Sequence, residues 1–292
     1  MPTPRSDGPD FFCVGAQKGG TRWLFDQVQF HPDFWMPPIK ELHYFDRRRP
    51  SPRAAKFIAR AETNLNRFNQ RRARRSMRPL NGEDIGFLKG YIDLPWRRRN
   101  PDAYAKLFAA KGERIAGDIT PDYCILRPEA IARVVRRFPE AKVVFIARDP
   151  VERVWSQLIM HMRKGSLDPN LDDAEIMRVV DKKFVARRTY QTDIVARWRR
   201  YVPESQFGLF LFDDLMAHPI DLRHRILTFL GADSAKPSGT VAAGFNRKRN
   251  PQKKPLSDAL RERLGRHLAA ELEASAREFG GAAADWPGRY GL

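Results

Sequence analysis

Two short segments near the N-terminus contain residues whose types and spacing could act on an anionic substrate. The first is Gly15-Ala-Gln-Lys-Gly-Gly20, which places Lys18 inside a glycine-rich loop just before Thr21. Glycine lets a backbone approach a ligand closely, and the free N–H groups of a following helix point at that ligand. Such a loop suits a phosphate group, and Lys18 adds a mobile positive charge. The alternative is an ordinary strand-to-helix turn in which the lysine has no role, because short motifs often match by chance.

The second segment is Lys40-Glu41-Leu-His43-Tyr-Phe-Asp46, in which ionisable residues stand among apolar ones. If this segment is extended, Glu41 and His43 lie on one face, because side chains alternate along a strand. A carboxylate beside an imidazole can remove the proton of a hydroxyl group. The other interpretation is a polar segment at the edge of the sheet that has no catalytic role.

The elements that must position these residues are strands and helices in alternation. The apolar run 11–14 predicts a buried strand, and the amphipathic run after Gly20 predicts a helix. Further strands are expected at 115–120, 142–147 and 207–212, with helices at 101–112, 128–138, 172–187, 190–201, 213–230 and 256–279. This alternation predicts an α/β three-layer sandwich with a central parallel sheet.

A third candidate segment, Arg148-Asp149-Pro150, follows the strand expected at 142–147. Open α/β sheets bind ligands at the carboxyl ends of their strands, so Arg148 leaves its strand where a ligand is expected. Ser156, two turns into the next helix, reaches the same place only if that helix packs against the crevice. Alternatively, Arg148 pairs with Asp149 or Glu152 on the surface.

Length and composition indicate one globular unit. The 292 residues, 42% hydrophobic and 30% charged, predict a single domain over residues 1–292. No 18-residue apolar run exists, and the first residues lack the apolar core of a signal peptide, so we expect no transmembrane segment and a cytoplasmic location. Cys13 and Cys124 are expected to be free thiols. No Cys/His cluster has metal-ligand spacing, so no metal is expected.

Positive charge is concentrated in one part of the chain. Of the net charge of +18, residues 47–100 hold sixteen Lys and Arg against four acids, a balance of +12. Leu65 and Phe68 predict a helix through this basic insert. Such a region attracts polyanions, although a solvated face that keeps the protein in solution is the alternative. A basic nucleic-acid-binding protein is a rival hypothesis, but no recognised nucleic-acid-binding motif is present.

Taken together, GAQKGGTRWL and PPIKELHYFD resemble the 5′-phosphosulfate-binding segment of sulfotransferases that use 3′-phosphoadenosine 5′-phosphosulfate (PAPS). The similarity is greatest to the branch that contains the heparan sulfate sulfotransferase domains and their bacterial relatives. The usual pattern has Thr or Ser where this chain has Arg22. A small-molecule P-loop kinase is the other enzyme considered, but its G-x-x-x-x-G-K-[ST] loop places the lysine next to the helix.

The resemblance implies a P-loop kinase-like sulfotransferase fold and a role for each matching residue. Donor binding is implied for Gln17, Lys18, Gly19, Gly20, Thr21, Arg22 and Trp23. Arg148-Asp-Pro-Val-Glu-Arg-x-x-Ser156 is similar to the 3′-phosphate-binding segment, and a basic loop containing Arg247 and Lys248 matches one that closes over the donor. Residues 117–123 are expected to line the acceptor pocket. The similarity covers residues 10–46 and 115–290 but not 47–100.

These roles imply a reaction. Lys18 would stabilise negative charge that develops on the oxygen bridging the phosphate and the sulfuryl group. Glu41 is the expected base, with His43 next. PAPS is the expected co-substrate, and the acceptor is expected to be a hydroxylated molecule, with polyanionic and lipid-linked acceptors both left open.

Overall fold

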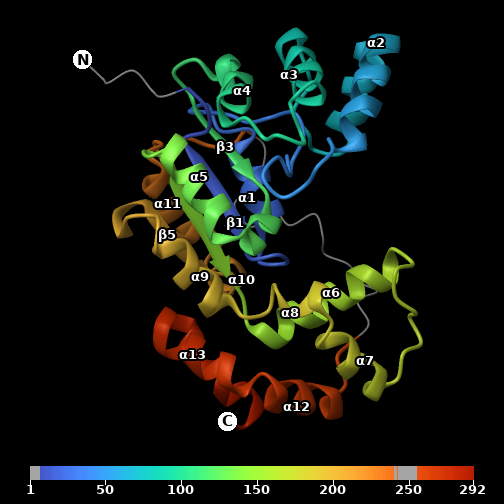
Figure 1. Ribbon diagram of the computed structural model, residues 1–292, viewed down its shortest axis with the longest axis vertical. Coiled ribbons are helices and arrows are strands. Elements are labelled where there is room, and N and C mark those ends of the chain that lie inside the picture. Colours follow the sequence, from blue (N-terminus) through green and yellow to red (C-terminus); the bar gives the residue numbers. More distant parts are fainter. Residues whose placement is uncertain (1–6, 240–241, 243–254) are drawn as a thin grey trace.

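The computed structural model describes residues 7–239, 242 and 255–292 (Figure 1). Its sheet has the strand order β2-β3-β1-β4-β5, and each recorded pairing is parallel. The parallel sheet expected from the sequence is therefore confirmed. The strands are β1 (Phe11–Gly15), β2 (Phe34–Trp35), β3 (Ile115–Ile119), β4 (Lys142–Ala147) and β5 (Phe207–Leu211).

Successive residues of the central strand face opposite sides of the sheet and enter two separate cores. Phe12 and Val14 of β1 belong to one apolar cluster, whereas Phe11 and Cys13 belong to the other. The first cluster is covered by α5 (Pro128–Arg137) and α9 (Gln191–Arg199), among other helices. The second is covered by α1 (Thr21–Val28) and α11 (Pro219–Leu230). Helices on both faces confirm the three-layer arrangement, which follows from strands that are buried on both faces.

Several predicted helices are each two elements. Residues 213–230 form α10 and α11, because Pro219 begins a new helix and disfavours a helical conformation at His218. The long helix expected at 256–279 is interrupted at Leu268, and the one at 172–187 after Val180. Residues 101–112 end in a 3-10 turn, Leu107–Lys111. The remaining helices are α2 (Pro52–Ala73), α3 (Gly82–Ile92), α4 (Pro101–Lys106), α6 (Pro150–Arg163), α7 (Asp173–Val180), α8 (Lys183–Ala186), α10 (Phe212–Ala217), α12 (Asp258–His267) and α13 (Ala269–Phe279).

The basic insert is helical, as Leu65 and Phe68 predicted. Its helices α2 and α3 lie at the upper right of Figure 1, far from α12 and α13 at the bottom. Phe68 of α2 and Phe87 and Tyr91 of α3 are buried in the first core cluster, so apolar packing ties the insert to the rest of the fold. Its basic side chains are mostly exposed, which keeps the charge of this region on the surface.

Both cysteines are free thiols, as expected, and both are buried. Burial raises the pKa of each thiol to about 12, so neither is a reactive thiolate at neutral pH. Among the helices of the described ranges, none is both long enough and apolar enough to cross a membrane.

Candidate functional site

The glycine loop between β1 and α1 is pressed against the end of β4. The Ala16 N–H donates to the Ile146 carbonyl at 2.9 Å, and the Gly19 N–H donates to the Ala16 carbonyl at 2.9 Å. A side chain at Gly19 would place its Cβ 2.3 Å from the Ile146 carbonyl oxygen, and Gly20 has a φ of 92°. Both glycines are thus required by the backbone itself. Gly20 is the N-cap of α1 and has no side chain with which to cap it, so the first-turn amides of α1 are suited to an anion.

The loop that contains Lys18 and the turn that contains Arg148 are in direct contact. One guanidinium nitrogen of Arg148 donates to the Lys18 carbonyl at 3.0 Å. The other lies 3.4 Å from a Glu152 carboxylate oxygen, so the surface pairing considered above also occurs. The guanidinium carbon stacks 4.4 Å from the Phe212 ring centroid. The two motifs, although separated by 130 residues in the chain, therefore meet at the carboxyl ends of adjacent strands.

The backbone of Arg148 is held by residues that no motif in the sequence indicated. The Gln191 side-chain oxygen accepts from the Arg148 N–H at 3.0 Å, and its amide nitrogen donates to the Arg148 carbonyl at 2.6 Å. Buried Glu271 of α13 accepts in turn from the Gln191 N–H at 2.7 Å. The Tyr290 hydroxyl donates to Asp149, which caps α6. The C-terminal segment thus orients the turn, a long-range role with no local signal.

The other residues expected to bind the donor lie in differing surroundings. Thr21 is buried and Ser156 is half-buried two turns into α6. The indole of Trp23 is buried in the second core cluster, which leaves only its backbone to face a ligand. Arg22 is turned along α1, with Nε 3.2 Å from Asp26. Arg247 and Lys248 lie outside the described residues.

Glu41 and His43 are not extended, so the alternation argument was wrong. Both have left-handed backbones, with φ values of 67° and 58°. The two side chains nevertheless face each other, with 3.8 Å between His43 Nε2 and Glu41 Oε2. A tight turn brings them together instead of the side-chain alternation of a strand.

Lys40, which the sequence analysis did not single out as a site residue, links this turn to the glycine loop. Its ammonium lies 2.7 Å from Glu41 Oε1 and 3.3 Å from the Thr21 hydroxyl oxygen. The side chain is only 8% exposed, so its charge is poorly screened by solvent. Its position next to a carboxylate in an otherwise apolar segment was the signal that could have found it.

The charges of this turn shift one another's pKa values. Burial would raise the pKa of Glu41, but the Lys40 ammonium and the hydrogen bonds from His43 and Lys40 hold it well below its ordinary value. Burial would lower the pKa of His43, but hydrogen bonds to Asp46 and Glu41 raise it to about 9. At neutral pH this site therefore holds a carboxylate at Glu41 and an imidazolium at His43, which cannot accept a further proton.

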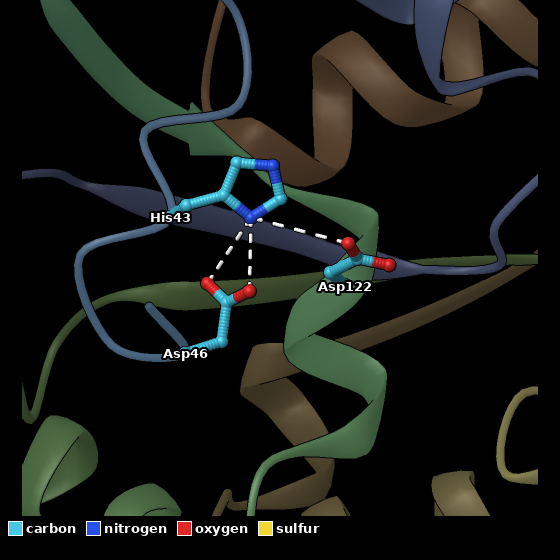
Figure 2. A group of neighbouring side chains, drawn as sticks. All are labelled: His43, Asp46 and Asp122. Atoms are coloured by element: carbon cyan, nitrogen blue, oxygen red, sulfur yellow. Dashed lines mark hydrogen bonds and ion pairs between the residues drawn. The ribbon is translucent and has the colours of Figure 1, made fainter. Parts of the chain in front are cut away.

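Figure 2 shows His43 with Asp46 and Asp122, the third from the turn after β3. His43 Nδ1 lies 2.9 Å from Asp46 and 4.0 Å from Asp122. One ligand atom of each residue could face a common cation, but a histidine must release its proton to bind a metal, and the raised pKa of His43 opposes that release. Asp122 also pairs with Arg188 at 3.0 Å, so its charge is already balanced.

Asp118, in the segment expected to line the acceptor pocket, lies beneath the site. It is fully buried and accepts hydrogen bonds from the hydroxyls of Tyr104, Tyr123 and Thr120, at 2.6 to 2.8 Å. It fixes the strand end and cannot reach an acceptor. Asp122, half-buried in the following turn, is the acid of this segment that faces His43. Gln17 donates to Asp122 at 3.1 Å, which joins the glycine loop to that turn.

The raised pKa of His43 predicts a specific pH dependence of stability. Because the folded pKa, about 9, exceeds the ordinary value near 6.5, protonation of His43 stabilises the fold fully below about pH 6.5. This contribution, on the order of 3 kcal/mol, is lost as pH rises through about 9. Urea unfolding of wild type and His43→Gln at several pH values checks this. The pH dependence should flatten in His43→Gln but not in a variant at exposed His224, and equal slopes would contradict it.

Comparison with known proteins agrees with this geometry. A sequence model of the sulfotransferase family matches residues 9–236. The chain is 23% identical over 237 residues to heparan sulfate glucosamine 3-O-sulfotransferase 5 of Mus musculus, covering 76% of this chain and 53% of that protein. The Homo sapiens protein of the same name is 24% identical over the same shares. The chain thus spans about half the length of the curated relatives it matches.

Solved structures share the fold. A sulfotransferase from Alicyclobacillus acidocaldarius superposes with a TM-score of 0.62 at 22% identity, over 95% of this chain and 98% of that one. Mouse sulfotransferase SULT7A1, solved in complex with PAP, gives 0.51 at 14% identity over 94% and 86%. These likenesses establish the P-loop-like α/β fold. With a family match over more than three quarters of its residues, the chain belongs to the sulfotransferase family.

Proposed function

We propose that this protein transfers a sulfuryl group from PAPS to an acceptor hydroxyl or amine. One observation carries the proposal: the Arg148 guanidinium donates to the Lys18 carbonyl at 3.0 Å. PAPS has a phosphosulfate at one end and a 3′-phosphate at the other. Two basic turns in contact at adjacent strand ends suit a donor of that shape, because each anionic end meets its own cation.

In this proposal the glycine loop holds the phosphosulfate. The first-turn amides of α1 and the Lys18 ammonium face the phosphate, while Arg148 and Ser156 take the 3′-phosphate. The acceptor oxygen attacks sulfur, the bond from sulfur to the bridging oxygen breaks, and adenosine 3′,5′-bisphosphate leaves. Lys18 stabilises the charge on that leaving oxygen, as a preorganised donor does.

Glu41 is proposed as the base that takes the acceptor's proton. It is ionised, and its side chain is 40% exposed, so an acceptor can reach it. His43, the second candidate, is an imidazolium at neutral pH and is proposed to orient Glu41 instead.

Lys40 is proposed to make the basicity of Glu41 depend on whether the donor is bound. While Lys40 pairs with Glu41, the carboxylate is a weak base, because its pKa is held low. The same ammonium lies 3.3 Å from Thr21 in the donor loop. A bound phosphosulfate would draw Lys40 toward its own charge and so raise the basicity of Glu41 once the donor is in place.

A Lys40→Met variant tests this adjustment. Loss of the ammonium removes a charge that lowers the pKa of Glu41, so the acid limb of kcat/KM should move to higher pH by about one unit or more. A pH–rate profile of wild type and variant measures the shift. Lys56→Met, on the exposed face of α2, is the matched control, and an unmoved acid limb in Lys40→Met would count against the proposal.

The acceptor is proposed to be a carbohydrate, glycolipid or small hydroxylated metabolite. Exposed Arg47 lies 3.8 Å from Asp122 beside the site, and the basic insert begins there. That placement favours an acceptor with negative charge. A P-loop kinase needs a lysine directly before the helix, and this chain has Gly20 there. No observation favours nucleic acid over other polyanions.

Ligand binding without turnover tests the proposed donor site. In calorimetry, wild type should bind adenosine 3′,5′-bisphosphate about tenfold or more tightly than AMP, which lacks the 3′-phosphate. Arg148→Gln should lose most of that preference, because only the Ser156 hydroxyl then remains of the two proposed contacts to the 3′-phosphate. Arg163→Gln, on the last turn of α6, should behave as wild type. Failure of wild type to bind either ligand would exclude PAPS as donor.

A further inference from the structure

A small pocket of about 210 Å³ lies beside the turn that carries Asp122. It is lined by the apolar side of Ile125, Leu126 and Pro128 and by three arginines, Arg127, Arg187 and Arg197. No acidic residue is among the described residues that line it. Its volume is below that of sites that enclose a whole drug-sized ligand, so it suits one substituent of a larger molecule.

One of the three arginines is held in place by hydrogen bonds, and the other two are exposed and could bind a ligand. The Arg197 guanidinium donates to the carbonyls of Cys124 and Leu126, at 3.2 and 3.3 Å, which holds it at the pocket wall. Arg127 and Arg187 are exposed, and no ion pair of their side chains occurs within the part of the chain that the structure describes. Guanidinium groups around one pocket without a carboxylate repel one another, and an anion would relieve that repulsion.

The pocket lies close to the candidate active site, because both include residues of the same turn. Arg187 directly precedes Arg188, which pairs with Asp122 at 3.0 Å. Asp122 and Ile125 belong to the same 3-10 turn, Pro121–Ile125, and three residues of such a turn span about 6 Å. Arg47, at the start of the basic insert, lies 3.8 Å from Asp122 on its other side. Arg47 and Arg188 thus both pair with Asp122, and Arg187, next to Arg188 in the chain, lines the pocket.

We propose that the pocket of Arg127, Arg187 and Arg197 binds an anionic substituent, a sulfate or a carboxylate, of the acceptor. The proposal rests on the proposed sulfuryl transfer and adds to it a requirement for charge on the acceptor away from the reacting hydroxyl. Bidentate guanidinium pairs suit either group, because both present two coplanar oxygens. The apolar wall would pack against the skeleton that carries the substituent.

Calorimetry with three tetrasaccharides tests the pocket. A heparin tetrasaccharide carries sulfates and carboxylates, a hyaluronan tetrasaccharide carries carboxylates only, and chitotetraose is neutral. Wild type should bind at least one charged sugar about tenfold or more tightly than chitotetraose, and which one binds identifies the substituent. The double variant Arg127→Gln/Arg187→Gln should lose about tenfold or more of that preference while its affinity for adenosine 3′,5′-bisphosphate stays the same.

The matched control removes two arginines from another part of the surface. Arg133→Gln/Arg136→Gln changes exposed residues of α5 outside the pocket, and should bind all sugars as wild type does. If both double variants lost the preference for the charged sugar equally, or if neither lost it, the proposed role of the pocket would be wrong. The proposed donor site would not be affected by that result. Failure of wild type to bind adenosine 3′,5′-bisphosphate would instead remove the proposed function, whatever the sugars show.

Discussion

Replacing Lys18 by alanine is expected to abolish most sulfuryl transfer while leaving the fold intact. Lys18 is the cation of the glycine loop, and its own carbonyl accepts from Arg148, so the backbone can stay in place when the side chain is shortened. Loss of one preorganised charge donor costs about 10²–10³-fold in kcat. Affinity for adenosine 3′,5′-bisphosphate should fall less than turnover, because the ammonium acts mainly on charge that develops during reaction.

A transfer assay with sulfur-labelled PAPS against a panel of hydroxylated acceptors measures this effect. Lys56→Ala, which removes an exposed lysine of α2, should transfer as wild type does. Urea unfolding of both variants should agree with wild type within about 0.5 kcal/mol. Turnover of Lys18→Ala at the wild-type rate would remove the role proposed for this residue.

Glu41→Gln is expected to lower kcat by about 10²–10⁴-fold, the usual worth of a general base. The glutamine keeps the shape of the side chain but cannot take a proton. It also removes one of the two carboxylates that raise the pKa of His43, so that pKa should fall from about 9 toward its ordinary value. Single-turnover kinetics give the first effect, and an NMR titration of the His43 ring gives the second.

Asp46→Asn separates the base from the residues that orient it. Asp46 lies 2.9 Å from His43 on the side away from Glu41, so this variant also lowers the pKa of His43 but leaves the Glu41 carboxylate. We expect it to lose far less turnover than Glu41→Gln. Equal losses in the two variants would mean that the charge on His43, and not a base at Glu41, limits transfer.

The parallel sheet and its two helical layers could be predicted from local patterns. Apolar strands at 11–14, 142–147 and 207–212 alternate with amphipathic segments, and such strands must be covered on both faces. Helix ends were less predictable. Leu268 is a good helix former, yet its backbone leaves the helical conformation and interrupts the helix expected at 256–279.

The motifs at 15–20, 40–46 and 148–156 resemble those of sulfotransferases, and this resemblance indicated the family and most of the candidate residues. Tertiary structure alone decided the rest. It bent Glu41 and His43 into left-handed conformations, linked Lys40 to Thr21, and held Arg148 through Gln191 and Glu271. Some of these contacts join residues that are distant in the chain, and the others depend on a turn that has no periodic pattern in the sequence. The pKa values of the site depend on these contacts, because charge interactions vary with distance in space. The protonation of the site therefore follows from the fold and not from the order of its residues.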